Sequence, residues 1–242
     1  MKTDVAEIGD GIWSFSTYVP QIAPPLGFTF NQFLIDADEP FLFHCGPRAM
    51  FPLVSAAFAG VMPLDRLRWI SFGHVESDEC GEMNLWLAAA PKAQVVHGTV
   101  ACMVSLNDLA DRPPRALGHG ETLDIGRRRI RYLDTPHVPH GWEAAVVYEE
   151  TTKTLFCGDL FTHFGNGPAV TKDSILEAAI IAEEQAHASA LTPQTAPTLR
   201  MLAELSPARL AVMHGSSFEG DCAGELSRLA DYYEKAHAAK GV

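Results

Sequence analysis

Three residues of the types that bind metal ions stand at alternate positions in one short stretch of the chain. His74, Glu76 and Asp78 follow the apolar run at 69–72. In an extended backbone, side chains two positions apart point to the same side, so this stretch would turn one imidazole and two carboxylates toward one spot. An H-x-E-x-D string can also be a polar loop with incidental acidity. It therefore predicts a metal site only if further ligands lie near it.

Three more candidate ligands come shortly after predicted strands, where loops often carry functional side chains. They are His137, Asp159 and His214. A single loop histidine is more often solvated or hydrogen bonded than metal-bound, and a single Asp after a strand is more often a turn former or a cap. Six such side chains together supply three imidazoles and a charge of about −3, which would balance two divalent ions and one hydroxide.

Other polar and aromatic residues near these positions are open to two interpretations. His140 could hydrogen-bond a bound species or support a ligand, or it could only contact the backbone. Trp142, Phe161 and Phe164 could wall a dry pocket, although core packing is the commoner role. The remaining histidines fit no motif position and are expected to be structural or solvent-facing, with His163 the strongest candidate for an exception: His44, His97, His119, His163, His187 and His237.

Composition limits the kinds of partner. The 242 residues are 47% hydrophobic, which predicts a single domain, residues 1–242, with one sizeable core. A net charge of −12 argues against nucleic acid and anionic membranes as partners. No signal-like N-terminus or apolar run of about 18 residues occurs, so we expect a cytoplasmic protein. Five cysteines without a C-x-x-C pair predict reduced thiols.

The predicted elements come as two halves, each rich in strands first and helices later. This order predicts an α+β protein in which two sheets pack face to face with helices outside. Strands are expected at 11–15, 28–35, 41–44, 69–72, 93–97, 122–124, 129–133, 144–148, 154–157 and 210–213. Helices are expected at 49–59, 82–90, 174–191 and 196–205, with a last amphipathic helix that turns Leu226, Leu229, Tyr233 and Ala236 inward.

Over essentially its whole length the chain resembles the metallo-β-lactamase superfamily. Most hydrolases of that superfamily have H-x-H-x-D-H in the first metal loop, whereas this chain has Glu76 and Glu79 at the second and last histidine positions. The pattern H-x-E-x-D-x-x-G is instead similar to that of the flavodiiron proteins and the shorter oxygen-binding diiron proteins. The resemblance implies an αββα sandwich of two mixed sheets flanked by helices, with two metal ions at one edge between the sheets.

The resemblance also implies a ligand set. For one iron it implies three terminal ligands: His74, Glu76 and His137. For the other iron it implies two terminal ligands and a carboxylate shared by both ions: Asp78, His214 and, as the bridge, Asp159. The family often has a histidine where this chain has Glu79. The second iron would then have an open or water-filled position, or an additional carboxylate.

A carboxylate at position 76 makes the site richer in oxygen, which favours iron or manganese over zinc, and zinc has no redox chemistry. The predicted cofactor is therefore a pair of iron ions with an oxide or hydroxide bridge. The relatives that reduce dioxygen or nitric oxide take electrons from a flavin in an added flavodoxin domain, for which this chain has no room, so no flavin is expected. The prediction is a non-haem diiron protein that binds dioxygen, either as a sensor or as an oxygen or nitric oxide reductase with an external electron donor.

The rival hypothesis is a dinuclear zinc hydrolase that acts on an ester, thioester or phosphodiester. Of the candidate residues, only Glu76 and Glu79 argue against it. A metal-stabilised binding module without turnover is close to the sensor hypothesis. The expected partners are dioxygen or nitric oxide and an electron-donor or signalling protein. The sequence leaves the oligomeric state open, a homodimer included.

Overall fold

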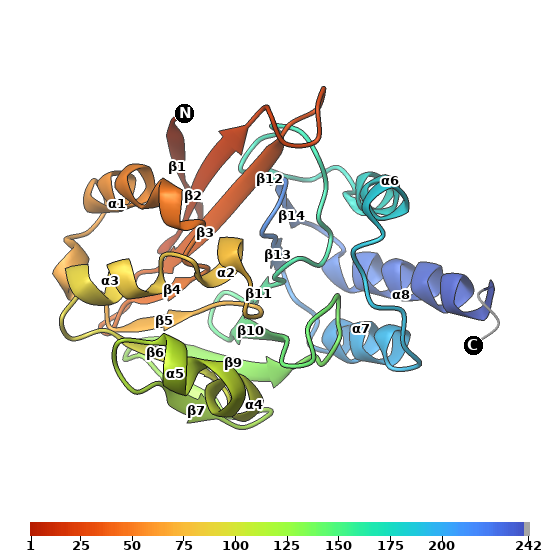
Figure 1. Ribbon diagram of the computed structural model, residues 1–242. Coiled ribbons are helices and arrows are strands. Elements are labelled where there is room, and N and C mark those ends of the chain that lie inside the picture. The colour runs from red at the N-terminus through yellow and green to blue at the C-terminus, as the bar shows by residue number, and fades with distance from the viewer. Residues whose placement is uncertain (240–242) are drawn as a thin grey trace.

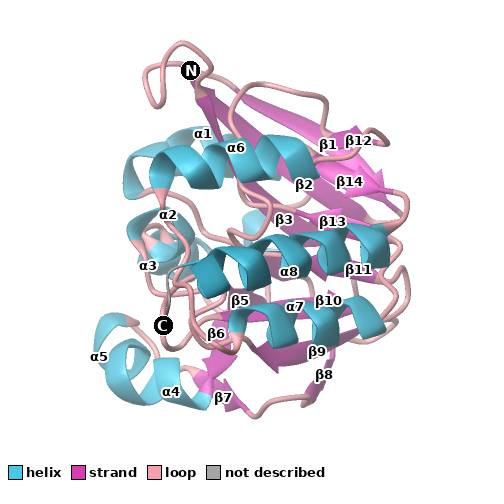
Figure 2. Ribbon diagram, turned by 90° about the vertical axis from the view of Figure 1, so that its right-hand side faces the viewer, coloured by secondary structure: helices cyan, strands magenta, loops and turns pink. Residues whose placement is uncertain are grey.

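Two seven-stranded sheets lie face to face in the middle of the computed structural model, which describes residues 1–239. Figure 1 shows α1 and α3 on the outside of the first sheet and α6, α7 and α8 on the outside of the second. In Figure 2 α7 and α8 lie in front of strands of the second sheet, and α6 lies beside α8. The predicted αββα sandwich is confirmed.

Each sheet combines antiparallel hairpins with parallel neighbours, so both are mixed. The first sheet has the order β1 (Thr3–Gly9), β2 (Ile12–Val19), β3 (Phe28–Ile35), β4 (Phe41–Phe43), β5 (Trp69–Ser71), β6 (Gln94–Gly98) and β7 (Arg115–Leu117). The second has the order β12 (Val170–Thr171), β14 (Ser217–Glu219), β13 (Arg209–Ala211), β11 (Thr154–Phe156), β10 (Ala145–Glu149), β9 (Arg129–Asp134) and β8 (Thr122–Asp124).

The helices follow the strands they cover. The α-helices are α1 (Phe51–Ala59), α2 (Ser77–Cys80), α3 (Met83–Ala89), α4 (Thr99–Ala101), α5 (Asn107–Leu109), α6 (Leu176–Ala186), α7 (Thr195–Glu204) and α8 (Cys222–Ala239). Short helical turns lie at Arg48–Met50 and Leu64–Arg66, and a π-helical turn at Cys102–Leu106 joins α4 to α5.

Most predicted elements are present, and the differences have local causes. The helix expected at 174–191 ends at Ala186, because the next residue, His187, takes a left-handed conformation with φ 51°. Strands β1, β7, β12 and β14 were not predicted. The last three have two or three residues each, and β1 is an edge strand with mostly exposed or partly exposed side chains, so none carries a strong apolar pattern.

Aromatic rings hold the two sheets together. Phe33 and Phe43 of the first sheet pack on Phe156 of the second, with ring centroids 5.5 and 5.6 Å apart. The five cysteines are free, as predicted. Among residues 1–239 no helix has both the length and the apolar character needed to cross a membrane.

Glu82, just before α3, is fully buried, and one of its carboxylate oxygens accepts a hydrogen bond from the Trp86 indole at 3.1 Å. Burial raises the pKa of Glu82 from its usual 4.5 to about 9. The folded protein therefore holds a proton here that the unfolded chain releases above about pH 4.5, so this group lowers stability as pH rises from 4.5 to 9.

Replacing Glu82 by glutamine should remove this pH-dependent penalty. We expect E82Q to raise the free energy of unfolding by up to about 5 kcal/mol at pH 8 and to change it little at pH 4, where both states of the wild type are largely protonated. Urea denaturation at the two pH values measures the difference. An equal effect at both would show that Glu82 is not protonated in the folded protein.

Candidate metal centre

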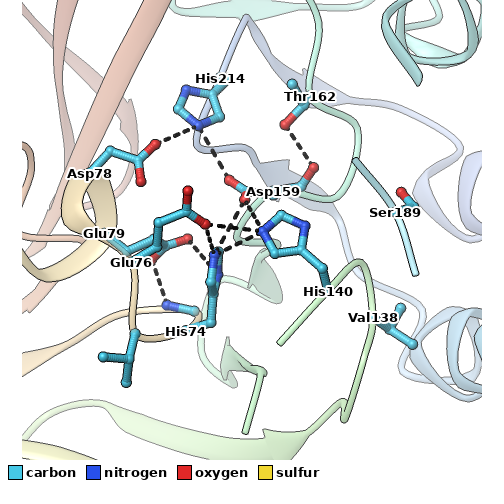
Figure 3. A network of polar contacts seen from close by, with 12 residues as sticks. His74, Glu76, Asp78, Glu79, Val138, His140, Asp159, Thr162, Ser189 and His214 are labelled. Carbon is cyan, nitrogen blue, oxygen red and sulfur yellow. Dashed lines mark hydrogen bonds and ion pairs between the residues drawn. The ribbon is translucent and has the colours of Figure 1, made fainter. Parts of the chain in front are cut away.

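The motif that follows β5 is extended only in its first half. Glu76 has φ −133° and ψ 160°, and α2 begins at the next residue, Ser77. The prediction that the extended backbone continues through Asp78 is therefore wrong. One helical step turns the Asp78 carboxylate away from His74 and toward His214, with Asp78 Oδ2 3.3 Å from His214 Nε2. Figure 3 shows Asp78 beside His214 and apart from the other motif side chains.

Four potential ligand atoms from three loops form a first group. His74 Nε2 lies 2.8 Å from Glu76 Oε2 and 2.9 Å from His140 Nε2. Asp159 Oδ2 completes the group, 3.4 Å from His140 Nε2, and the four atoms lie within 4.8 Å of one another. Two ring nitrogens bound to one ion at right angles, with bonds of about 2.1 Å, would be about 3 Å apart. The spacing therefore suits one metal ion.

His140, and not His137, is the histidine that this loop contributes. The His137 side chain is exposed, its backbone has φ 63°, and its N–H donates to the Gly141 carbonyl at 2.7 Å. This tight turn points His137 outward, while the buried residues Val138 and Pro139 carry the chain back to the centre. The structure thus does not bring the predicted ligand His137 to this group, and it brings His140, expected only as a supporting residue, there instead.

A second group lies beside the first. His214 Nε2 is 3.3 Å from Asp78 Oδ2 and 3.3 Å from Asp159 Oδ1. The other ring nitrogen, Nδ1, lies 2.7 Å from the Thr29 carbonyl oxygen, to which it can only donate. That hydrogen bond leaves the Nε2 lone pair free to face a metal ion.

Asp159 lies between the two groups, with Oδ1 turned to His214 and Oδ2 to His74 and His140. Its Oδ1 is buried and lies 3.3 Å from His214 Nε2. Burial alone would raise the pKa of Asp159, but the hydrogen bond and charge of His214 and the charges of His74 and His140 hold it well below its usual range. An ionised carboxylate with one oxygen toward each group is the arrangement that a bridge between two cations requires.

The pKa values of the two histidines shift in the opposite direction, upward. Burial would lower the pKa of His214, but Asp159 and Asp78 outweigh burial and raise it to about 10. The pKa of His74 is also raised, because Glu79, Asp159 and Glu76 together outweigh its burial. A metal ion would replace these protons, so binding would release protons and weaken as the solution becomes more acid.

Strand β3 of the first sheet positions the His214 loop of the second. The Asn31 side-chain amide donates to the carbonyls of Val212 and Gly215 at 2.9 and 2.8 Å. Gly215 has φ +104°, and a Cβ there would lie 2.3 Å from the ring of His163, so this turn requires glycine. Phe28 stacks on His214 with ring centroids 4.1 Å apart.

Comparison with known proteins identifies the family and supports the fold. The family model described as ODP family beta lactamase matches residues 28–215. The chain belongs to this family. The rubredoxin-oxygen oxidoreductase of Megalodesulfovibrio gigas is 21% identical over 243 residues, which cover 95% of this chain and 60% of that protein. The chain thus spans about 60% of the length of that relative.

Solved structures show the same fold. A fragment of putative diflavin flavoprotein A 5 from Nostoc sp. PCC 7120 has a TM-score of 0.83 at 18% identity, covering 99% of this chain and 98% of that one. A metal-soaked Flv1 flavodiiron core from Synechocystis sp. PCC6803 has a TM-score of 0.81 at 20% identity, covering 97% of this chain and 61% of that one.

In this family member Glu79 lies next to the candidate metal centre, on the Nδ1 side of the His74 ring. Its side chain is fully buried, and its Oε2 accepts hydrogen bonds from the Gly73 N–H at 2.7 Å and from His44 Nδ1 at 2.5 Å. Its Oε1 is 3.5 Å from His74 Nδ1, on the side of that ring opposite Nε2. A Cβ on Gly73 would lie 2.9 Å from Glu79, so glycine is needed for this approach. The carboxylate thus lies beside Nδ1 of His74, and the expectation that it could bind the second ion is not supported.

The remaining histidines are buried in the structure or face solvent, as predicted. Nδ1 of His163 donates to the Phe161 carbonyl at 2.8 Å, and its Nε2 accepts from the Ser216 N–H at 2.9 Å, so neither nitrogen is free. His97 is fully buried, and burial lowers its pKa to about 3. His44 is the one with a role near the centre, through Glu79. No motif pointed to that pair, because 35 residues separate its members.

The expected aromatic walls are found only in part. Phe161 and Phe164 line a cavity that reaches the centre. Trp142 does not line it, and 58% of its surface is exposed. The hydrogen bonds that form the 135–144 loop turn Trp142 to the outside, while His140 faces inward.

Proposed function

We propose that this chain holds two iron ions between its sheets and binds dioxygen there, serving as a sensor or as an oxygen or nitric oxide reductase supplied by a separate electron donor. The observation that supports this most strongly is Asp159, which turns one carboxylate oxygen toward each of two ligand groups. The proposed ligands are His74, Glu76 and His140 at one ion and Asp78 and His214 at the other, with Asp159 shared.

The donor set fits iron. Three carboxylates and three imidazoles are hard to borderline donors, and the side chain of Glu76 faces the first group, with its Oε2 2.8 Å from His74 Nε2. An iron pair supplies two electrons to dioxygen, which zinc cannot do. The rubredoxin-oxygen oxidoreductase and the flavodiiron core to which this chain is similar carry names that agree with such chemistry.

The protein's own groups have distinct tasks in this proposal. The Thr29 carbonyl and Glu79 hold the two histidine rings in place, so their Nε2 atoms face the ions. Phe28, stacked on His214, and Phe164 keep one side of the centre apolar. Excluding water there would favour the entry of an uncharged gas over that of anions.

Metal content and reaction with oxygen test the proposal. Protein produced in iron-supplemented medium should contain close to two iron ions per chain. After anaerobic reduction and mixing with oxygen, its visible spectrum should change. A long-lived change would indicate a sensor, and continuous oxygen consumption with an added donor would indicate a reductase. Zinc at two ions per chain together with esterase activity would overturn the proposal in favour of a hydrolase.

A substitution at Glu76 tests the metal preference itself. Changing Glu76 to histidine gives the first metal loop the H-x-H pattern, and we expect the ratio of bound iron to bound zinc to fall at least about tenfold when the metals compete at equal concentration. Glu76→Asp, which keeps the carboxylate, is the matched control and should still prefer iron over zinc. An unchanged ratio in E76H would show that this position does not set the metal.

A further inference from the structure

A cavity of about 220 Å³ extends from the candidate metal centre between α6 and α8. Asp78, His140, Asp159 and His214 lie along one part of its wall. Most of the remaining wall is apolar, with aromatic rings and alanine methyl groups. We propose that this cavity binds a small organic molecule with an apolar body of about one ring and a head group that donates hydrogen bonds, an ammonium or a hydroxyl, without an acidic group.

The size of the cavity exceeds the needs of a diatomic gas. One water molecule occupies about 30 Å³ in the liquid, and a cavity of about 150 Å³ in another protein accommodates benzene. The 220 Å³ here therefore suits a single-ring molecule.

Helix α6 keeps this space open. Ala179, Ala182 and Ala186 line the cavity at helical spacing, so each contributes only a methyl group where a larger residue would fill it. Phe161 and Phe164 face the same space. Alanine at all three positions leaves room beside rings that can contact an apolar body.

The polar side chains of the cavity that lie away from the metal centre determine which ligand head group can bind. Ser189 Oγ donates to Glu183 Oε2 at 2.8 Å and lies 2.7 Å from the Tyr233 hydroxyl. In Figure 3 Ser189 lies on the side away from His74 and Glu76. No Lys or Arg is among the lining residues, so nothing there balances the charge of Glu183.

Metal ions at the centre would offset the carboxylates that face them, but not Glu183. A ligand carboxylate or phosphate near Glu183 would therefore be repelled, while an ammonium or hydroxyl could donate to it. The inference rests on the cavity and does not require the proposed function.

Calorimetric titration of the purified, metal-loaded full chain with three probes at pH 7 tests the inference. Benzylamine, benzyl alcohol and benzenesulfonate share one ring and differ in head group. We expect saturable binding of the first two and at least tenfold weaker binding of the sulfonate. No saturable binding of benzylamine or benzyl alcohol, or equal binding of all three, would overturn the inference.

Two α6 variants locate the binding. Ala182→Leu should weaken benzyl alcohol binding at least tenfold, because it fills the cavity, whereas Ala178→Leu on the exposed side of the same helix should leave it unchanged. Equal affinities in A182L and A178L would place the molecule elsewhere. Glu183→Gln, which leaves the volume unchanged, should weaken benzylamine more than benzyl alcohol, and an equal effect on both would refute the role of Glu183. Iron content measured on the same samples separates these results from loss of the metal centre.

Discussion

Replacing His140 by alanine is expected to reduce bound iron from about two ions per chain to one or fewer and to abolish the reaction with oxygen. Its Nε2 lies 2.9 Å from that of His74 and 3.4 Å from Asp159 Oδ2, so its loss removes one of four donors from the first group. Loss of a direct ligand should weaken iron binding at that group at least about 100-fold, since loss of an outer partner alone costs about 10- to 100-fold. Iron analysis after dialysis against a weak chelator measures the change.

His137→Ala is the matched control, three residues away in the same loop. Because the His137 side chain is exposed and its φ is positive, the variant should keep wild-type iron content and oxygen reactivity. If H137A lost iron and H140A retained it, the loop would have to rearrange when metal binds, and the ligand assignment proposed here would be wrong.

The 135–140 loop marks a limit of what the sequence could predict about the site. The stretch Thr135–Pro–His–Val–Pro–His contains two histidines, and the ligand implied by the resemblance was assigned to the first of them, His137. Which one turns inward depends on the hydrogen bond from the His137 N–H to the Gly141 carbonyl and on the burial of Val138. Neither follows from residue type or periodicity.

Local patterns were sufficient for most of the fold. Strands β3 and β10 are rich in apolar residues and buried along nearly their whole length because both of their faces are covered, and α8 shows its inward face at helical spacing. The candidate metal centre depends more than the fold does on contacts between segments that are far apart in the sequence. Asn31 holds the 212–215 loop, and His44 pairs with Glu79. Such pairs of polar residues leave no periodic signal in the sequence.

Replacing Glu79 by alanine should weaken both the fold and the metal centre. Glu79 and His44 are fully buried, with Glu79 Oε2 2.5 Å from His44 Nδ1. The change therefore leaves His44 Nδ1 and the Gly73 N–H without their acceptor. Breaking such a buried pair costs about 3–5 kcal/mol, and we expect the free energy of unfolding to fall by about that amount. Loss of the carboxylate near His74 Nδ1 should also lower iron affinity about 10- to 100-fold.

Glu79→Gln separates positioning from folding, because it keeps the shape and one carbonyl acceptor. Its amide oxygen can still accept from the Gly73 N–H, so we expect a stability loss of about 1–2 kcal/mol. The uncharged amide polarises His74 less than a carboxylate does, so iron affinity should still fall measurably while the fold is kept. Chemical denaturation and competition with a coloured chelator give the two quantities on one preparation. If E79Q binds iron as tightly as the wild type, Glu79 serves only the packing behind β5, and the orientation of His74 must come from the backbone of its loop.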